Sequence, residues 1–200
     1  MKLKTNLSLD VANNIIDSAI ENGREQNLLP LTVVVLDSGG KIIASKSEDG
    51  SSNMRFEIAY GKAWGALGLG MSSRLIADKM SSRPTFLNAL AALSKGKFIP
   101  VPGGVLIEDA EGFTIGAIGI SGDTSEKDEY CAIIAIKESG LFPEPAEIDP
   151  SLNSKLQKWI LLKCKGFQAK VFWVSLWIYS QVMNLVVSFK VWNFIVLFFC

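Results

Sequence analysis

The sequence predicts an α/β fold in which helices cover both faces of a mainly antiparallel sheet. Two observations support this fold class. Two pairs of short β-branched runs, within residues 32–46 and 105–121, are each joined by turn-forming residues, which is typical of β-hairpins. Segments with apolar residues at helical spacing lie before, between and after these pairs. Because such helices must bury their apolar sides, we expect them to pack on the sheet.

The first elements along the chain are a helix and a hairpin. Apolar residues recur at helical spacing in residues 9–27, and Ser8 precedes them as a suitable N-cap. Residues 32–36 form a largely β-branched run, as in a strand that is covered on both faces. The glycine-containing turn 37–41 then leads into a second strand at 42–46.

Three helices are expected between the two hairpins. The first spans residues 53–67 and carries alanines, glycines and one lysine, Lys62. The other two span residues 72–82 and 85–94, and Pro84 separates them because proline disfavours a continuous helix.

The second hairpin and a last helix complete the predicted fold. Strands at 105–107 and 113–121 flank the turn 109–112, where a type I turn followed by a left-handed Gly112 is expected. The last helix, 125–139, follows directly.

The last helix has a signal at each of its ends. Ser125 and Asp128 match a capping box at its start. Gly140 and the prolines at 143, 145 and 150 indicate that the domain ends here.

Residues 102–129 carry most of the functional information. Six glycines among β-branched residues mean that the backbone turns tightly or is approached closely. The segment ends where a helix should begin, and the unpaired N–H groups of a helix N-terminus can hold an anionic group. The candidate ligand-binding residues of this segment are Gly103, Gly104, Ser121, Gly122 and Asp123.

Several of these glycines also have a purely structural interpretation. Gly103 and Gly104 could instead form a turn that needs positive φ. For Gly116 and Gly119 we favour tight packing of a helix on the sheet.

The same residues carry a family resemblance. The segments Pro-Gly-Gly-Val-Leu-Ile at 102–107 and Gly-Ala-Ile-Gly-Ile-Ser-Gly-Asp at 116–123 resemble the C-terminal half of the GlcG/HbpS-like family of haem-binding or haem-degrading domains. Residues 31–40 resemble the first hairpin of the family, and residues 58–63 resemble its central helix. A related module is fused to some corrinoid adenosyltransferases. The resemblance covers roughly residues 8–141.

The resemblance implies a profilin-like α/β/α sandwich, haem or a related tetrapyrrole as ligand, and a homo-oligomer. It also favours a ligand-binding role for Lys62, which lies among small residues that let another element approach closely. The alternative for this lysine is a surface position with its aliphatic stem packed on apolar neighbours.

The chain contains no histidine, which removes the commonest general base, metal ligand and haem axial ligand. The atoms left for haem ligation belong to tyrosine, lysine, methionine and cysteine side chains, namely Met54, Tyr60, Lys62, Met71, Tyr130 and Cys131. No nucleophile–base pair is visible, so catalytic residues cannot be assigned and an enzymatic activity is left open. No metal site is predicted, because the acidic residues 123, 128 and 129 match no standard calcium loop.

Composition divides the chain into two predicted domains, 1–150 and 151–200. Residues 1–150 carry 14 basic and 20 acidic side chains, a net charge of −6, which argues against nucleic-acid binding. Their single cysteine and the absence of an apolar segment after the N-terminus favour a cytoplasmic location.

Residues 151–200 form a hydrophobic tail with six lysines, no acidic residue and four of the five tryptophans. We favour the interpretation that this tail is read-through of non-coding sequence, since the domains of the family normally end near residue 141. A membrane anchor is the second interpretation, because residues 171–189 are uncharged and long enough to span a bilayer. A soluble helical extension is the third.

Three hypotheses for function follow from these residues and from the resemblance. The first is a domain that binds haem or a related tetrapyrrole. The second is an enzyme, or an enzyme accessory, acting on a small organic acid or a corrinoid. The third is a structural oligomerisation domain.

Overall fold

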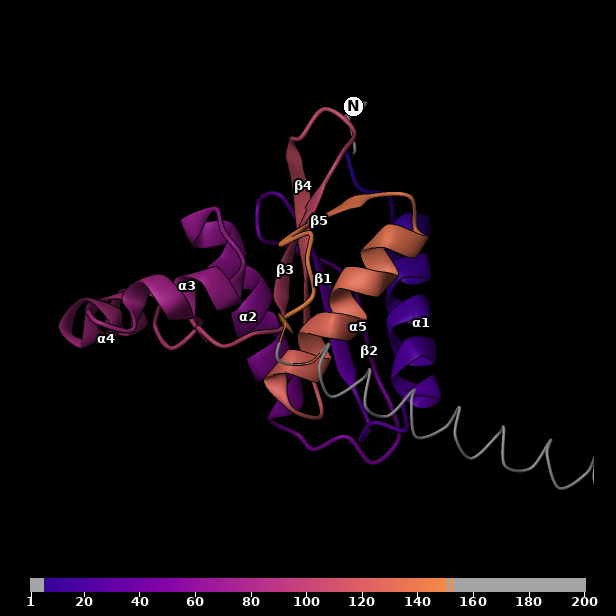
Figure 1. The fold of residues 1–200 in the computed structure, drawn as a ribbon, viewed down its shortest axis with the longest axis horizontal. Coiled ribbons are helices and arrows are strands. Elements are labelled where there is room, and N and C mark those ends of the chain that lie inside the picture. The colour runs from indigo at the N-terminus through magenta and orange to yellow at the C-terminus, as the bar shows by residue number, and fades with distance from the viewer. Residues whose placement is uncertain (1–5, 151, 153–200) are drawn as a thin grey trace, which may run out of the picture. The chain divides into compact units, whose positions relative to one another are not determined.

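The computed structural model describes residues 6–150 and residue 152. The elements of this part are helices and strands that alternate along the chain (Figure 1). In order they are α1 Leu9–Glu25, β1 Thr32–Asp37, β2 Ile42–Ser47, α2 Arg55–Leu69, α3 Ser73–Met80, α4 Pro84–Leu93, β3 Gly104–Glu108, β4 Thr114–Ser121, α5 Ser125–Glu138 and β5 Phe142–Glu144.

One antiparallel sheet organises the described residues, with the strand order β2-β1-β4-β3-β5. The two predicted hairpins, β1–β2 and β3–β4, are confirmed, and β1 pairs with β4 to join them. The expected left-handed Gly112 is confirmed as well, at φ +81°. β5 was not predicted. It is a three-residue edge strand, where Pro143 is tolerated because the ladder is open on one side.

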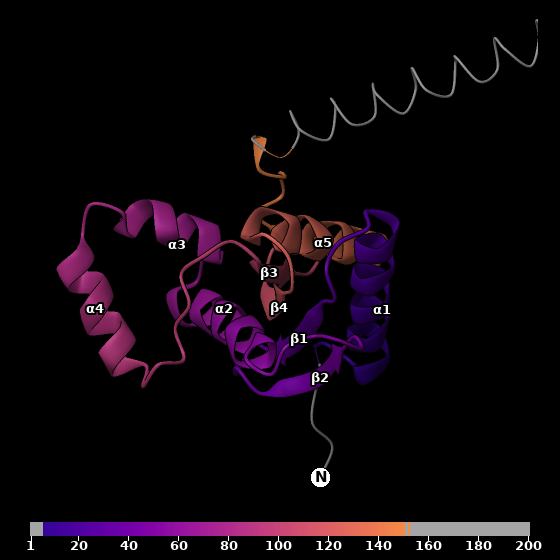
Figure 2. The same cartoon turned by 90° about the horizontal axis from the view of Figure 1, so that it is seen from below.

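The sheet is covered on both faces, so the predicted three-layer α/β/α sandwich is confirmed (Figures 1 and 2). α1 and α5 pack on one face, where alternate residues of the central strands, including Val33, Val35, Ile118 and Ile120, form the larger core cluster. α2 packs on the other face, against a smaller cluster that includes Val34 and Leu36 of β1. β1 is buried on both faces, as its β-branched run predicts.

α2 lies unusually close to the sheet because glycines leave room for its backbone. Gly104 and Gly119 are paired across β3 and β4 and face α2. A Cβ atom on Gly119 would lie 1.9 Å from the Ala59 carbonyl oxygen, and one on Gly104 would lie 2.3 Å from the Lys62 carbonyl oxygen. The predicted packing of a helix on Gly119 is therefore confirmed.

Gly116 differs from this prediction, because its close neighbours belong to other parts of the fold. A Cβ atom there would lie 2.3 Å from the Leu36 carbonyl oxygen of β1 and 2.9 Å from Cδ2 of Leu7. The space beside Gly116 is therefore occupied by the adjacent strand and by the segment that precedes α1.

α3 and α4 extend sideways from the sandwich, as the views in Figures 1 and 2 both show. The chain then returns along the outer side of α2, where Phe98 packs beside Gly65 and Ile99 beside Gly61. α2 is thus held between the sheet and this returning segment.

The membrane-anchor, read-through and helical-extension interpretations all concern residues 151–200, which lie outside the described part except for residue 152. Among the helices that the structure describes, none combines the length and the apolar character needed to cross a bilayer.

Candidate functional site

Lys62 of α2 is fully buried, and its side chain reaches β4 and the start of α5. Its Nζ atom donates a hydrogen bond to the Ile120 carbonyl oxygen at 2.9 Å and forms an ion pair with Asp128 Oδ2 at 2.8 Å. The side chains of Lys62 and Asp128 are only 2% and 1% exposed. Lys62 thus has a partner inside the protein, and its small neighbours make room for the sheet backbone.

Burial is the largest influence on the two members of this ion pair. It lowers the pKa of Lys62 and raises the pKa of Asp128, because both charged forms lose hydration. The opposite charge of the partner, at hydrogen-bond distance, counteracts both shifts. The pair is therefore costly to break, since removal of either partner leaves a buried charge unpaired.

Gly103 and Gly104 lie directly beside this ion pair. Gly103 has φ +115°, as in the structural interpretation of this glycine, and a Cβ atom there would lie 2.8 Å from Lys62 Nζ. Gly104 N–H donates to Ser73 Oγ at 2.8 Å. In the described structure, α2 backbone and Lys62 occupy the space that these glycines leave open.

The loop before α5 is held by its own carboxylates. Asp123 accepts hydrogen bonds from the N–H groups of Leu29 at 3.1 Å and Thr124 at 2.8 Å. Burial acts to raise the pKa of Asp123, but these hydrogen bonds and the Lys127 ammonium group at 3.1 Å together hold the pKa below its usual value. At Gly122, a Cβ atom would lie 2.5 Å from Leu31 Cδ2. The loop therefore serves to fix the chain that enters β1.

The predicted capping box at the start of α5 is wrong. The N-cap is Thr124, whose side chain makes no capping hydrogen bond. Asp128 instead accepts from Asp123 N–H at 3.2 Å through Oδ1, while its Oδ2 holds Lys62. The Asp128 carboxylate points inward because the buried Lys62 ammonium group needs a partner of opposite charge.

Arg55, the first residue of α2, is the cation that sequence reasoning missed. Its Nη1 donates a hydrogen bond to Ser121 Oγ at 3.2 Å, and Ser121 is 1% exposed. Arg55 itself is half-buried, and no carboxylate of the described residues forms an ion pair with it. The positive charge of Arg55 acts to lower the pKa values of both Lys62 and Asp128.

A cluster of hydroxyl groups continues from Ser121 at this end of the sheet. Thr32 faces Ser121 in the β1–β4 ladder and is itself 1% exposed. Its Oγ1 atom lies 2.9 Å from Ser47 Oγ and 2.7 Å from Ser51 Oγ. Arg55 therefore stands at the edge of a polar, hydrogen-bonded surface that can receive an anionic group.

The three acidic residues considered for a hard cation face different partners. Asp123 binds backbone N–H groups, Asp128 binds Lys62, and Glu129 pairs with Arg74 at 2.9 Å. Within the described ranges, no group of three or more histidine, cysteine or carboxylate side chains is arranged to hold a metal ion.

The side chains that could ligate haem iron differ in their exposure to solvent. Lys62 and Cys131 are buried, and burial raises the pKa of the Cys131 thiol to about 12. Met54, which precedes Arg55, is 64% exposed. The thioether of Met54 is therefore accessible beside Arg55, whereas the Lys62 amine and the Cys131 thiol are enclosed by protein.

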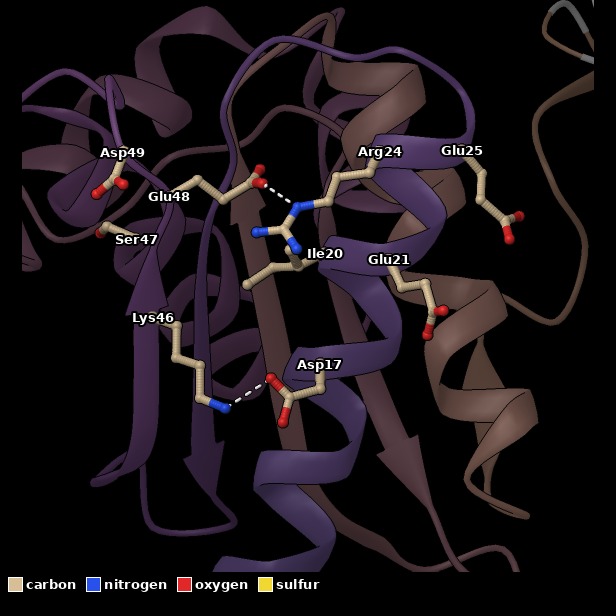
Figure 3. A pocket seen from close by; sticks show the side chains of 9 residues that line it. All are labelled: Asp17, Ile20, Glu21, Arg24, Glu25, Lys46, Ser47, Glu48 and Asp49. Carbon is tan, nitrogen blue, oxygen red and sulfur yellow. Dashed lines mark hydrogen bonds and ion pairs between the residues drawn. The ribbon is translucent and has the colours of Figure 1, made fainter.

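A groove of about 840 Å³ lies between α1 and β2, on the face of the sheet opposite to α2 (Figure 3). Five carboxylates and two cations line it. Both cations are already paired, Arg24 with Glu48 at 2.8 Å and Lys46 with Asp17 at 2.6 Å. An anionic ligand would be repelled by the remaining carboxylates, so this groove suits the propionates of a haem poorly.

One family model matches most of the described residues. The family model described as "Haem degrading protein HbpS-like" matches residues 7–137. The chain is 26% identical to the protein in the crystal structure of a PduOC:heme complex, with a TM-score of 0.59, and the match covers 66% of this chain and 93% of the other.

Two further solved structures share the fold. One is the ORFY protein of Klebsiella pneumoniae, with 24% identity, a TM-score of 0.62, and coverage of 70% of this chain and 94% of the other. The second is a double mutant of HbpS from Streptomyces reticuli, with 22% identity, a TM-score of 0.59, and coverage of 69% and 90%. The search of curated proteins found no match. On the strength of the match over residues 7–137, this chain belongs to the HbpS-like family.

Proposed function

We propose that this chain is a haem- or tetrapyrrole-binding domain that holds a carboxylate of its ligand at the start of α2. The observation that carries the proposal is Arg55, a half-buried guanidinium without a carboxylate partner among the described residues. Membership of the HbpS-like family and the similarity to a protein crystallised with haem support the choice of ligand.

The residues around Arg55 offer a contact for one carboxylate of the ligand, with exposed apolar side chains beside it. Arg55 supplies charge-assisted hydrogen-bond donors to one propionate, and the buried Ser121 Oγ holds the guanidinium in place. Met54 and Leu29 are 64% and 60% exposed, and Asp123 ties the Leu29 backbone to the loop that follows Ser121. When bound, haem would supply a redox-active iron, and Met54 is the accessible candidate for its axial ligand.

The other predicted site residues would hold α2, β4 and α5 in position without contacting the ligand. Lys62 and Asp128 tie α2 to β4 and α5, and Gly103, Gly104 and Gly122 allow the close contacts that position these elements. We therefore assign Arg55, rather than Lys62, the direct contact with the ligand.

A small organic acid is the second candidate ligand, because a guanidinium beside a hydroxyl group is also a general carboxylate site. An enzymatic role has no comparable support. The histidine-free chain presents no nucleophile–base pair among the residues assigned to this site.

The family membership also leads us to propose that the domain works as a homo-oligomer in which every copy carries this site.

Haemin titration of the full-length chain, followed by Soret absorbance, tests the haem proposal. Arg55→Gln should weaken binding about tenfold, because a charge-assisted hydrogen bond contributes about 1.5 kcal/mol. Arg24→Gln is the matched control and should bind like the wild type. Met54→Leu should change the Soret spectrum.

Two outcomes would refute the proposal in different ways. Equal affinity of Arg55→Gln and wild type would place the ligand elsewhere on the domain. If the wild type itself produces no Soret change, haem is not the ligand. A thermal-shift screen with small carboxylic acids and cobalamin would then test the second candidate, again with Arg55→Gln as the comparison.

A further inference from the structure

α4 is an apolar helix in which no residue is fully buried by the described part of its own chain. Its ten residues, Pro84–Leu93, include no charged side chain, and none of them is buried. Phe86 is 43% exposed and Leu93 is 81% exposed. Isolated helices shorter than ~12 residues are marginal in water, and most gain their stability from packing of an apolar face. The exposed apolar face of α4 is therefore of the kind that serves as an interaction surface.

The arm, defined here as residues 73–97, differs from the rest of the domain in charge. It carries five basic residues and one acidic residue, whereas the rest of residues 1–150 carries nine basic and nineteen acidic residues. Its outer cations Lys79, Arg83, Lys95 and Lys97 are exposed and form no ion pair with the described residues. A basic, apolar arm thus projects from an acidic domain. Every copy of the chain therefore carries both a basic arm and acidic groups that could attract the arm of another copy.

The hairpin end of the sheet offers both apolar and acidic groups. It consists of the turns at 37–42 and 108–114 with the start of β5, which the strand register places together, and the start of α1, whose preceding residue Leu7 lies beside Gly116 of β4. Its exposed apolar side chains are Leu9, Ile42, Phe113 and Phe142, each at least 48% exposed. The β3–β4 turn adds the carboxylates of Glu108, Asp109 and Glu111.

An arm cannot easily serve the hairpin end of its own copy. Figure 1 shows the β3–β4 turn at the upper end of the sheet, whereas α3 and α4 leave the sandwich sideways, and Figure 2 shows the same sideways course. The two surfaces therefore face different directions on one molecule.

We propose that the arm of one copy docks on the hairpin end of a second copy. α4 would cover the exposed aromatic and aliphatic side chains there, and the arm cations would meet the carboxylates of the β3–β4 turn. This inference rests on the proposed self-association and adds the two surfaces that make it. It does not depend on haem binding.

Sedimentation velocity of the full-length chain tests the role of α4. Phe86→Ser combined with Leu93→Ser should shift the protein to a lower mass without changing its far-UV circular dichroism spectrum, because neither side chain is buried. Val101→Ser is the control, because Val101 is an exposed apolar residue, at 38%, that lies outside both surfaces and outside the proposed ligand site, and it should leave the mass unchanged. An unchanged mass in the arm variant would overturn the inference.

A charge swap tests the proposed pairing of the two surfaces. Lys79→Glu, Lys95→Glu and Lys97→Glu together change the net charge of the arm from +4 to −2, and Glu108→Lys with Glu111→Lys changes that of the turn 108–114 from −3 to +1. Each variant alone should be of lower mass than the wild type, because its two surfaces then repel. An equimolar mixture of the two should regain association, since the reversed arm meets the reversed hairpin end. A mixture that stays at lower mass would show that the arm docks elsewhere.

The wild type separates this inference from the broader proposal of self-association. A monomeric wild type at 100 µM would overturn both, and flotation of that monomer with phosphatidylserine vesicles would identify an anionic lipid surface as the partner of α4. An oligomer that is indifferent to all arm variants would overturn only the arm–hairpin contact. Dissociation at 1 M sodium chloride is expected, because salt screens the charge pairing.

Discussion

Replacing Gly119 by alanine should strongly destabilise the domain, because α2 occupies the space that a side chain would need. The added Cβ atom would lie 1.9 Å from the Ala59 carbonyl oxygen, whereas carbon–oxygen contacts are normally no closer than ~3.3 Å. α2 would therefore have to move away from β4 by more than ~1 Å. Gly104, its partner in β3, already touches α2 backbone, so the sheet has no room to adjust there.

The size of the effect follows from what this movement disrupts. Overpacking of a core costs about 1–3 kcal/mol. Displacement of α2 also strains the two Lys62 hydrogen bonds, and hydrogen bonds to charged groups contribute ~1.5–3 kcal/mol. We expect a loss of at least about 3 kcal/mol, which lowers the urea midpoint by ~1 M or more.

Urea denaturation of the full-length chain, followed by circular dichroism, measures this loss. Gly68→Ala in α2 is the control, because nothing lies within 4 Å of its added Cβ atom. That substitution should stabilise the protein by up to ~1 kcal/mol, since alanine is the better helix former. A Gly119→Ala protein within 1 kcal/mol of the wild type would refute the argument that backbone contact fixes α2.

The remaining predictions concern the buried charges. Lys62→Met should cost about 3–5 kcal/mol in urea denaturation by leaving Asp128 unpaired, and Asp128→Leu in the same chain should restore much of this; a double variant as unstable as the single one would contradict it. Burial raises the pKa of Glu129 to about 7, so the folded state holds that proton more tightly than the unfolded state. Its contribution to stability is therefore present below pH 4.5 and lost as the pH rises to about 7. Relative to Glu129→Gln, the wild type should lose up to about 3 kcal/mol between pH 4.5 and 8, and parallel curves would exclude the shift. Asp123→Ala should unfold at lower urea concentration by about 1–3 kcal/mol, because the Leu29 and Thr124 N–H groups lose their acceptor, and hydrogen exchange at both amides should rise.

Most of the fold could be predicted because its signals are local. Turn residues and helical periodicity lie within short windows, so two hairpins and five helices could be placed to within a few residues. β5 could not, because its three residues become a strand only by pairing with β3, some 35 positions earlier. Pro143 within β5 was instead interpreted as part of the end of the domain, because proline is rare in strands except at a sheet edge.

The candidate site could be predicted only in part, because its decisive contacts join distant segments. Lys62 was recognisable as a cation among small residues, but its partner Asp128 lies 66 positions away. Asp128 was instead assigned to a capping box with Ser125, the interpretation that a local pattern allows. Arg55 looked like an ordinary residue at the start of a helix, and its contact with Ser121 also spans 66 positions.

The β1–β4 pairing that joins the two hairpins has a consequence for folding kinetics. Each hairpin closes a short loop, whereas Leu36 of β1 meets Ala117 of β4 across about 80 residues of chain. Closing that long loop should limit the folding rate, which places the domain among the slower α/β folds. Because the entropy of closure grows only with the logarithm of loop length, trimming the α3–α4 segment should hardly accelerate folding. A change that strengthens contacts between α2 and the sheet should accelerate it more, if those contacts form in the transition state.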